Sequence, residues 1–229
     1  MNNKNQLVSI IIPTFKGEKT IHTLIKELIK ILKDINFEIV VVNDSSPDSS
    51  DEILTDLYNS NSDVITYVKL AKNSGEYNAV MAGLRNCKGT IAITVDDDLQ
   101  HPPSEVYKLI KYSLESEQDV IYTEFKKYNY SYVRNLLSKF YNLTANLLLN
   151  KPKNIYLSSF KSLRRNVIDE VIKYEGNYAY IDGLIFSSTK KIGSFLVNHE
   201  SRKNGKSGYT LKKFAKHYGN LIFNFSAMP

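Results

Sequence analysis

The first 124 residues alternate between two sequence patterns, and this alternation restricts the fold more than any other feature of the chain. Five short runs are rich in β-branched residues and apolar throughout, which is typical of strands buried on both faces. Between them, apolar residues recur three or four positions apart, as on one face of an amphipathic helix. Strands are expected at residues 7–13, 37–44, 64–70, 90–96 and 119–125, and helices at 18–33, 49–59, 75–86 and 103–116.

Strands that alternate with helices form right-handed crossovers, so we expect an α/β protein with a mostly parallel sheet flanked by helices. In such sheets, ligands bind beyond the carboxyl ends of the strands. Four polar stretches follow predicted strands at these ends, and their convergence predicts a ligand site at one edge of the sheet. They are Pro13-Thr14-Phe15, Asn43-Asp44-Ser45, Asn73-Ser74-Gly75 and Asp96-Asp97-Asp98.

The second half of the chain is organised differently, but no linker divides it from the first, so a single domain over residues 1–229 is expected. Residues 132–150 and 209–225 are expected to form amphipathic helices, the second of them basic, and residues 158–165 and 192–201 to form strands. The single cysteine, Cys87, excludes an intramolecular disulfide and suits a reducing compartment. The polar N-terminus resembles neither a signal peptide nor a membrane span.

The net charge of +6 is distributed unevenly along the chain. Residues 1–124 contain 12 Lys and Arg against 19 Asp and Glu, a net charge of −7, whereas residues 125–229 contain 18 against 5, a net charge of +13. A basic half suits nucleic acid, an anionic membrane surface or a phosphorylated substrate. A solvated basic face without a partner is the simpler alternative.

The stretch VDDDLQHPP is the strongest candidate for a metal site. Side chains alternate along a strand, so Asp96 and Asp98 are expected on the same side of the chain, with an oxygen of Gln100 two residues further on. Oxygen ligands completed by substrate phosphates suit Mg²⁺ or Mn²⁺. The alternative is an acidic turn that caps the helix starting near Pro102.

Two other strand-end stretches suggest a nucleotide site. Asp44 can accept a hydrogen bond from a nucleobase N–H, and the alternative is a turn followed by a helix cap at Ser49 or Ser50. Gly75 lies at a loop-to-helix junction, where backbone N–H groups can face a phosphate or a sugar. A plain helix start explains Gly75 equally well.

Five segments together closely resemble the family 2 glycosyltransferases of the dolichyl-phosphate mannose synthase type, which include bacterial enzymes that load a sugar onto polyprenyl phosphate. The segments are VSIIIPTFKGE, VVVNDSSPDSSDEIL, KLAKNSGEYNAVMAGL, VDDDLQHPP and SRKNGKSGYTLKK, in this order. The resemblance spans Val8 to Pro229 and implies the Rossmann-like glycosyltransferase-A (GT-A) fold. Residues 1–124 would bind the nucleotide-sugar, and residues 125–229 would bind the acceptor and approach the membrane.

The resemblance also implies roles for individual residues. The metal and diphosphate would be bound by Asp96, Asp98 and Gln100, with Arg202 beside the donor diphosphate as a further catalytic group. The acceptor phosphate would contact Arg134, Ser138 and Lys126. The donor site would contain Pro13, Thr14, Phe15, Glu18, Asp44, Asn73, Gly75, Asp97 and Ser207.

The chain departs from the family pattern at four places. Phe15-Lys16-Gly17 replaces a usual Tyr-Asn-Glu, which leaves open whether Glu18 takes the place of the glutamate. Asn43 replaces an aspartate, Gly208 replaces a lysine, and Phe125 stands where an arginine is usual, leaving Lys126 or Lys127 as substitutes. These departures bear on the identity of the donor and acceptor rather than on the reaction class.

The implied reaction is a metal-dependent, inverting transfer of a sugar from a UDP-, GDP- or dTDP-sugar to a polyprenyl (undecaprenyl) phosphate, with Mg²⁺ or Mn²⁺ as cofactor. The acceptor lies in a bilayer, so the enzyme is expected to be peripheral at the cytoplasmic face of the membrane, with no nucleic-acid partner. Family members often continue into hydrophobic spans after the equivalent of FSAMP, and whether this chain does so stays open.

Three other functions are compatible with parts of the sequence. A family 2 enzyme of cell-surface polysaccharide synthesis would use a sugar hydroxyl as acceptor and need a carboxylate base, for which Asp182 is the candidate. The alternative for Asp182 is a helix N-cap. A nucleotidyltransferase would usually have a glycine-rich loop after the first strand, and PTFKGEKT has one glycine. A non-catalytic binding module would leave the four strand-end stretches unexplained.

Overall fold

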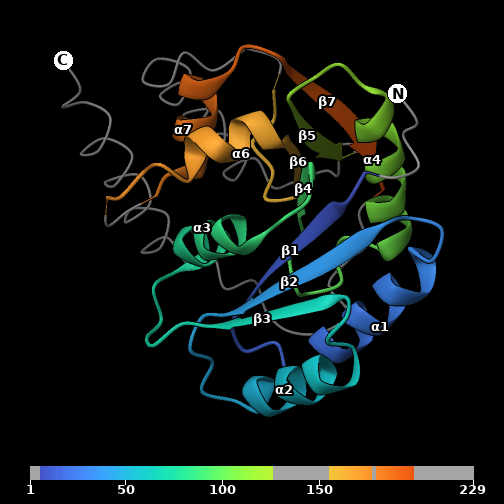
Figure 1. Cartoon of the computed structure of the whole chain (residues 1–229), viewed down its shortest axis with the longest axis vertical. Helices are drawn as coiled ribbons and strands as arrows, with labels where there is room; N and C mark the ends of the chain where they lie inside the picture. Colours follow the sequence, from blue (N-terminus) through green and yellow to red (C-terminus); the bar gives the residue numbers. More distant parts are fainter. Residues whose placement is uncertain (1–5, 126–154, 177–178, 199–229) are drawn as a thin grey trace, which may run out of the picture.

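The computed structural model describes residues 6–125, 155–176 and 179–198. Within these residues one sheet has the strand order β3-β2-β1-β4-β6-β5-β7 (Figure 1). The strands are β1 (Val8–Thr14), β2 (Phe37–Asn43), β3 (Ile65–Lys69), β4 (Ile91–Thr94), β5 (Val120–Phe125), β6 (Lys161–Arg164) and β7 (Ile192–Val197). The helices are α1 (Ile21–Ile31), α2 (Ser50–Ser60), α3 (Glu76–Asn86), α4 (Pro103–Glu115), α6 (Arg165–Val171) and α7 (Ile181–Ser188).

The sheet is mostly parallel, as expected. Strands β3, β2, β1 and β4 run parallel to one another, and β5 pairs in parallel with β7. Strand β6 lies antiparallel between β4 and β5. The start of β6 therefore lies at the edge of the sheet where β4 ends, and Lys161 pairs with Thr94 on one side and with Tyr122 on the other.

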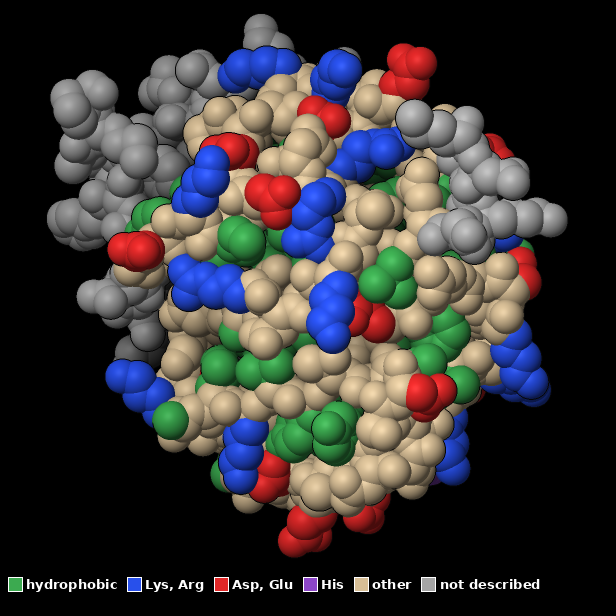
Figure 2. Space-filling model, in the orientation of Figure 1, with side chains coloured by type: hydrophobic (Ala, Val, Ile, Leu, Met, Phe, Trp, Pro, Cys, Tyr) green, Lys and Arg blue, Asp and Glu red, His purple; other side chains and the backbone are tan. Residues whose placement is uncertain are grey.

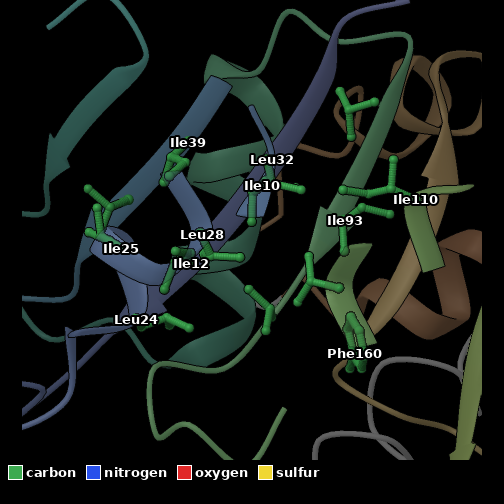
Figure 3. Packing of buried hydrophobic residues seen from close by; sticks show 14 of the residues in the cluster. Ile10, Ile12, Leu24, Ile25, Leu28, Leu32, Ile39, Ile93, Ile110 and Phe160 are labelled. Carbon is green, nitrogen blue, oxygen red and sulfur yellow. The ribbon is translucent and has the colours of Figure 1, made fainter. Parts of the chain in front are cut away.

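Two hydrophobic clusters cover the two faces of the sheet, which explains why the strands are apolar throughout. On one face, α1, α2 and α4 contribute to a cluster that includes Ile10 and Ile12 of β1. In α1 the buried stripe consists of residues three or four positions apart, namely Ile21, Leu24, Ile25 and Leu28, of which Figure 3 labels the last three. On the other face, α3, α6 and α7 cover Ile11, Ala92 and Tyr122.

The predicted strands and helices of the first half are confirmed to within a few residues. In the second half, β6 is shorter than the predicted strand at 158–165, because the chain turns into α6 at Arg165. Helix α6 was not predicted, and a helix at the position of α7 was considered only in the alternative that makes Asp182 an N-cap. Both helices are short, and their N-cap residues, Arg164 and Tyr180, are not of the usual capping types, so the sequence signal for a helix start is absent. The predicted helices at 132–150 and 209–225 lie outside the described residues.

The face drawn in Figure 2 shows charges of both signs. On the face drawn in Figure 2, Lys and Arg side chains are interspersed with Asp and Glu side chains. Among the described residues, no helix is both long and apolar enough to cross a bilayer. Much of the basic second half of the sequence lies outside these residues, so the predicted basic surface stays a prediction.

Candidate active site

The loops that follow β1, β2 and β3 are tied together by Asp44. Its backbone N–H donates to the carbonyl oxygen of Thr14 at 2.9 Å. Its carboxylate accepts the backbone N–H of Ser74 at 2.7 Å and of Gly75 at 2.9 Å. The predicted convergence of these strand ends is therefore confirmed. The Gly75 N–H donates to Asp44 in this structure, and the predicted contact of this junction with a phosphate or a sugar of the donor stays a prediction.

The loop after β4 joins the same group through a close approach to Gly17. A Cβ atom on Gly17 would lie 2.7 Å from Oδ2 of Asp97 and 2.7 Å from Cγ2 of Thr14. Such distances are well inside van der Waals contact, so a larger residue at this position would require the Asp97 and Thr14 side chains to move. Gly17 also donates its N–H to Oγ of Ser50 at 3.0 Å, which fixes the β1 loop against the start of α2.

Each of the four loops contains one residue with a left-handed backbone. These residues are Lys16 after β1 (φ 61°), Ser45 after β2 (φ 54°), Gly75 after β3 (φ 89°) and Leu99 after β4 (φ 61°). A positive φ is unfavourable for residues other than glycine, and such strain tends to persist at functional sites. The strain is thus concentrated where the sequence predicts the ligand.

Asp96 and Asp98 lie in a turn and not in a strand, because β4 ends at Thr94. The argument from strand alternation was therefore wrong, and other contacts fix the two carboxylates. Oδ2 of Asp96 accepts the hydroxyl of Ser159 at 2.7 Å and lies 3.4 Å from Nε2 of His101. Oδ1 of Asp98 accepts the backbone N–H of Gln100 at 3.0 Å.

These carboxylates fit a divalent ion that is completed by substrate oxygens. No group of three or more His, Cys, Asp or Glu side chains with metal-binding geometry exists within the described residues. Mg²⁺ and Mn²⁺ are commonly bound by one or two carboxylates together with phosphate oxygens and water. Asp96 and Asp98 supply this donor set within one turn. The side chain of Gln100, the third predicted ligand, is half-buried in the same turn.

Asp97 differs from its two neighbours. Its Oδ2 atom is buried without a hydrogen-bond partner among the described residues, against Gly17 of the β1 loop. Burial, and then the charges of Asp96 and Asp98, raise the pKa of Asp97 to about 8. Asp97 thus lies between the loops that follow β1 and β4, and its predicted contact with the donor stays a prediction.

The other predicted donor residues surround Asp44. Pro13 and Thr14 end β1, and the ring of Phe15 is 44% exposed beyond them. Asn73 donates its side-chain amide to the Asp44 carbonyl oxygen at 3.4 Å. Oε2 of Glu18 accepts the N–H of Ser49 at 3.3 Å, so Glu18 connects the β1 loop to α2.

Asn43, where the family usually has an aspartate, is fully buried and has a structural explanation. Its side-chain amide donates to the hydroxyl of Tyr67 at 3.0 Å, and its Oδ1 accepts the N–H of Ser46 at 2.9 Å. The Tyr67 hydroxyl donates in turn to Asp51 in the first turn of α2. An amide can donate to this hydroxyl while a carboxylate cannot, so the asparagine suits the network.

Asp182 lies in the first turn of α7 and is not its N-cap, which is Tyr180. Its Oδ1 accepts the hydroxyl of Tyr122 at 2.8 Å and forms an ion pair with Nζ of Lys161. Lys161 and Asp182 are each only 5% exposed, so this is a buried salt bridge. Burial, and then the charge of Asp182, raise the pKa of Tyr122 well above its ordinary value.

Sequence reasoning missed Lys161, Ser159, His101 and Glu76. Lys161 and Ser159 were assigned to a strand without a further role, although they lie in a basic, serine-rich stretch. His101 follows the aspartates closely and packs against Phe160, with 4.8 Å between the ring centroids. Arg134, Ser138, Lys126, Arg202 and Ser207 lie outside the described residues.

Comparison with known proteins identifies the family. The family model described as glycosyl transferase family 2 matches residues 9–172. The chain belongs to glycosyl transferase family 2. It is therefore a glycosyltransferase, and the family resemblance of its motifs is confirmed.

The relatives of this family 2 glycosyltransferase include two undecaprenyl-phosphate 4-deoxy-4-formamido-L-arabinose transferases. The protein from Aeromonas hydrophila is 28% identical over 227 residues, which cover 98% of this chain and 68% of the relative. The protein from Pseudomonas savastanoi pv. phaseolicola is 30% identical over 226 residues, which cover 98% and 67%.

A solved structure with a similar fold is glucosyl-3-phosphoglycerate synthase from Mycobacterium tuberculosis in complex with Mn²⁺, UDP and phosphoglyceric acid. The TM-score is 0.71 at 16% identity, and the match covers 98% of this chain and 80% of that chain. At this identity the likeness establishes the fold alone. The expected GT-A fold is thus confirmed.

Proposed function

We propose that the chain transfers a sugar from a nucleotide-sugar to a polyprenyl phosphate, with inversion at the anomeric carbon and with the help of Mg²⁺ or Mn²⁺. The observation that carries this proposal is the meeting of four strand-end loops, three of them joined by Asp44 and the fourth, which contains Asp96 and Asp98, by the approach of Asp97 to Gly17. The named activity of the two relatives, which match along 98% of this chain, supports the choice of acceptor.

The donor side of the site suits a nucleoside diphosphate. The exposed ring of Phe15 can stack on a nucleobase. The carboxylate of Asp44 accepts two backbone N–H groups, and its remaining lone pairs can accept a nucleobase N–H. Asp96 and Asp98 would hold a divalent ion, which would neutralise the charge that develops on the departing β-phosphate. Arg202 and Ser207 are proposed to contact the same diphosphate.

A phosphate acceptor must be held in the correct orientation but does not require a general base. A phosphate monoester is already ionised at neutral pH, so its oxygen can attack without losing a proton first. The bond from the anomeric carbon to the β-phosphate oxygen breaks, and the nucleoside diphosphate leaves with the electron pair. The acceptor phosphate oxygen forms the new bond from the opposite side. Lys126, Arg134 and Ser138 are proposed to hold the acceptor phosphate in line.

The engagement of Asp182 also favours a phosphate acceptor. A hydroxyl acceptor requires a base that is free to take its proton. In this structure Oδ1 of Asp182 is occupied by Tyr122 and by the ammonium group of Lys161. Such a carboxylate is better suited to balancing the charge of Lys161. Since the acceptor lipid lies in a bilayer, the enzyme is proposed to work as a peripheral protein at the cytoplasmic face of the membrane.

Release of nucleoside diphosphate by the purified chain tests this function. A panel of UDP-, GDP- and dTDP-sugars is offered with Mg²⁺ or Mn²⁺, with and without undecaprenyl phosphate. We expect release with one donor class, dependent on both the lipid and the metal. Release that proceeds equally well without the lipid would contradict the proposed acceptor, and retention of configuration in the product would contradict inversion.

Ser159→Ala is expected to weaken the affinity for the divalent ion about 10- to 100-fold, because an outer residue that orients a metal ligand has effects of this size. The variant removes the hydroxyl that donates to Asp96 at 2.7 Å. Metal titration of the nucleoside diphosphate release provides the measurement. Ser60→Ala, which removes an exposed hydroxyl at the end of α2, is the control. An unchanged metal requirement in Ser159→Ala would show that Asp96 does not depend on this contact.

A further inference from the structure

Glu76 is the first residue of α3, and its backbone is fixed at the edge of the sheet that carries the active site. The preceding residue, Gly75, donates its N–H to Asp44. On the other side, the ring of Tyr77 meets the ring of Tyr180 edge-on, with 5.5 Å between their centroids. Tyr180 is the N-cap of α7, so this contact brings the first turns of α3 and α7 together.

The side chain of Glu76 lies within electrostatic reach of the other charged groups of the site. Loss of water around the Glu76 carboxyl group, and then the charge of Asp96, raise its pKa to about 7, and Lys161 acts in the opposite direction. Asp182 and Asp98 raise the pKa further. By its accessible surface Glu76 is an exposed residue, so its side chain can be reached from solvent.

Within the described part of the chain, Glu76 is also the carboxylate of this group that no hydrogen bond or ion pair engages. Asp182 is bonded to Tyr122 and Lys161, and Asp96 is bonded to Ser159. No hydrogen bond or ion pair joins the Glu76 side chain to another of the described residues. It is also not part of a group of three metal-binding side chains among those residues.

We propose that Glu76 accepts a hydrogen bond from a ring hydroxyl or N–H group of the donor sugar and thereby helps to select that sugar. This inference rests on the proposed function, which places the donor diphosphate at Asp96 and Asp98. The sugar is bonded to that diphosphate, so it would lie at the edge of the sheet where α3 begins, and Glu76 directly follows Gly75, which donates its N–H to Asp44 at this edge. Hydroxyl and N–H groups are the donors that sugars offer to a carboxylate.

The simpler explanation is that Glu76 only stabilises α3. A glutamate in the first turn of a helix interacts favourably with the helix dipole by about 0.3–1 kcal/mol. That role would affect the stability of the fold and the affinity for every ligand alike. Contact with the sugar would affect only the affinity for ligands that carry the sugar. The two roles therefore differ in how the affinity for a nucleotide-sugar compares with the affinity for its free nucleoside diphosphate.

Calorimetric titration of the full chain with three ligand pairs tests the inference. The pairs are UDP-glucose and UDP, GDP-mannose and GDP, and dTDP-glucose and dTDP, each with Mg²⁺. For the pair that the wild-type protein binds, we expect Glu76→Ala to weaken the nucleotide-sugar about tenfold or more, as for a lost hydrogen bond to a charged group, while the free diphosphate keeps its affinity. Glu76→Gln, which retains an acceptor oxygen, should lose less of the affinity for the nucleotide-sugar than Glu76→Ala.

The matched control is Glu52→Gln, which alters an exposed glutamate in the first turn of α2. It should change neither affinity. Equal weakening of both members of the pair by Glu76→Ala, or no weakening of either, would overturn the role in sugar selection. Failure of the wild-type protein to bind any pair would instead overturn the proposed function, and with it this inference. The titration of the wild-type protein thus distinguishes a failure of the proposed function from a failure of the inference about Glu76.

Discussion

Asp98→Asn is expected to lower kcat for sugar transfer about 10³-fold at saturating donor, the largest effect on activity of any single change in the described residues. The substituted amide would keep the shape of the side chain and an oxygen able to accept the Gln100 N–H, which Asp98 accepts at 3.0 Å. It would remove the negative charge that attracts a divalent ion. The fold should therefore survive while stabilisation of the leaving diphosphate is lost.

The measurement is the initial rate of nucleoside diphosphate release, recorded over a range of Mg²⁺ and Mn²⁺ concentrations. Asp56→Asn, which removes one negative charge from an exposed position on α2, should behave as the wild type. Partial rescue of Asp98→Asn at high metal concentration would agree with weakened metal binding. A rate close to that of the wild type at ordinary metal concentrations would show that Asp98 does not hold the ion.

The sequence carries enough local information to predict the first half of the fold. Buried parallel strands are apolar throughout, and the first helix has a regular buried stripe, so both patterns are strong. Helices α6 and α7 are harder to predict because they are short and because Arg164 and Tyr180, at their N-caps, are not usual capping residues. The antiparallel position of β6 was not predictable either, since it depends on pairing with β4 and β5 rather than on the residues of β6.

In the site too, some residues can be predicted from local sequence, and others depend on tertiary contacts. Asp44 and Asp98 were found because they follow strands, and parallel strands bring their carboxyl ends to one edge. The partners of these residues come from distant parts of the chain. Ser159 orients Asp96 across 63 positions of the sequence, and Tyr122 bonds to Asp182 across 60. Such contacts are set by tertiary packing, so a lysine such as Lys161 looks like an ordinary strand residue until the fold is known.

Lys161→Met is expected to destabilise the protein by about 3–5 kcal/mol, the largest expected effect on stability. The ammonium group of Lys161 is the cationic partner of Asp182, and both residues are only 5% exposed. Removing the lysine leaves an uncompensated buried carboxylate with only the Tyr122 hydroxyl as a partner among the described side chains. The free energy of unfolding, from urea titration followed by circular dichroism, gives the measurement, and Lys190→Met at an exposed position is the control.

The double variant Lys161→Met/Asp182→Asn separates the structural role of Asp182 from a role as a base. It removes both buried charges, so most of the lost stability should return, because a buried ion pair contributes little net stability. If Asp182 only balances Lys161, the double variant should still transfer sugar to undecaprenyl phosphate at a rate near that of the wild type. If Asp182 is a general base for a hydroxyl acceptor, the rate should fall about 10²- to 10⁴-fold although the fold is restored. The network that buries Asp182 against Lys161 and Tyr122 leads us to expect the first result.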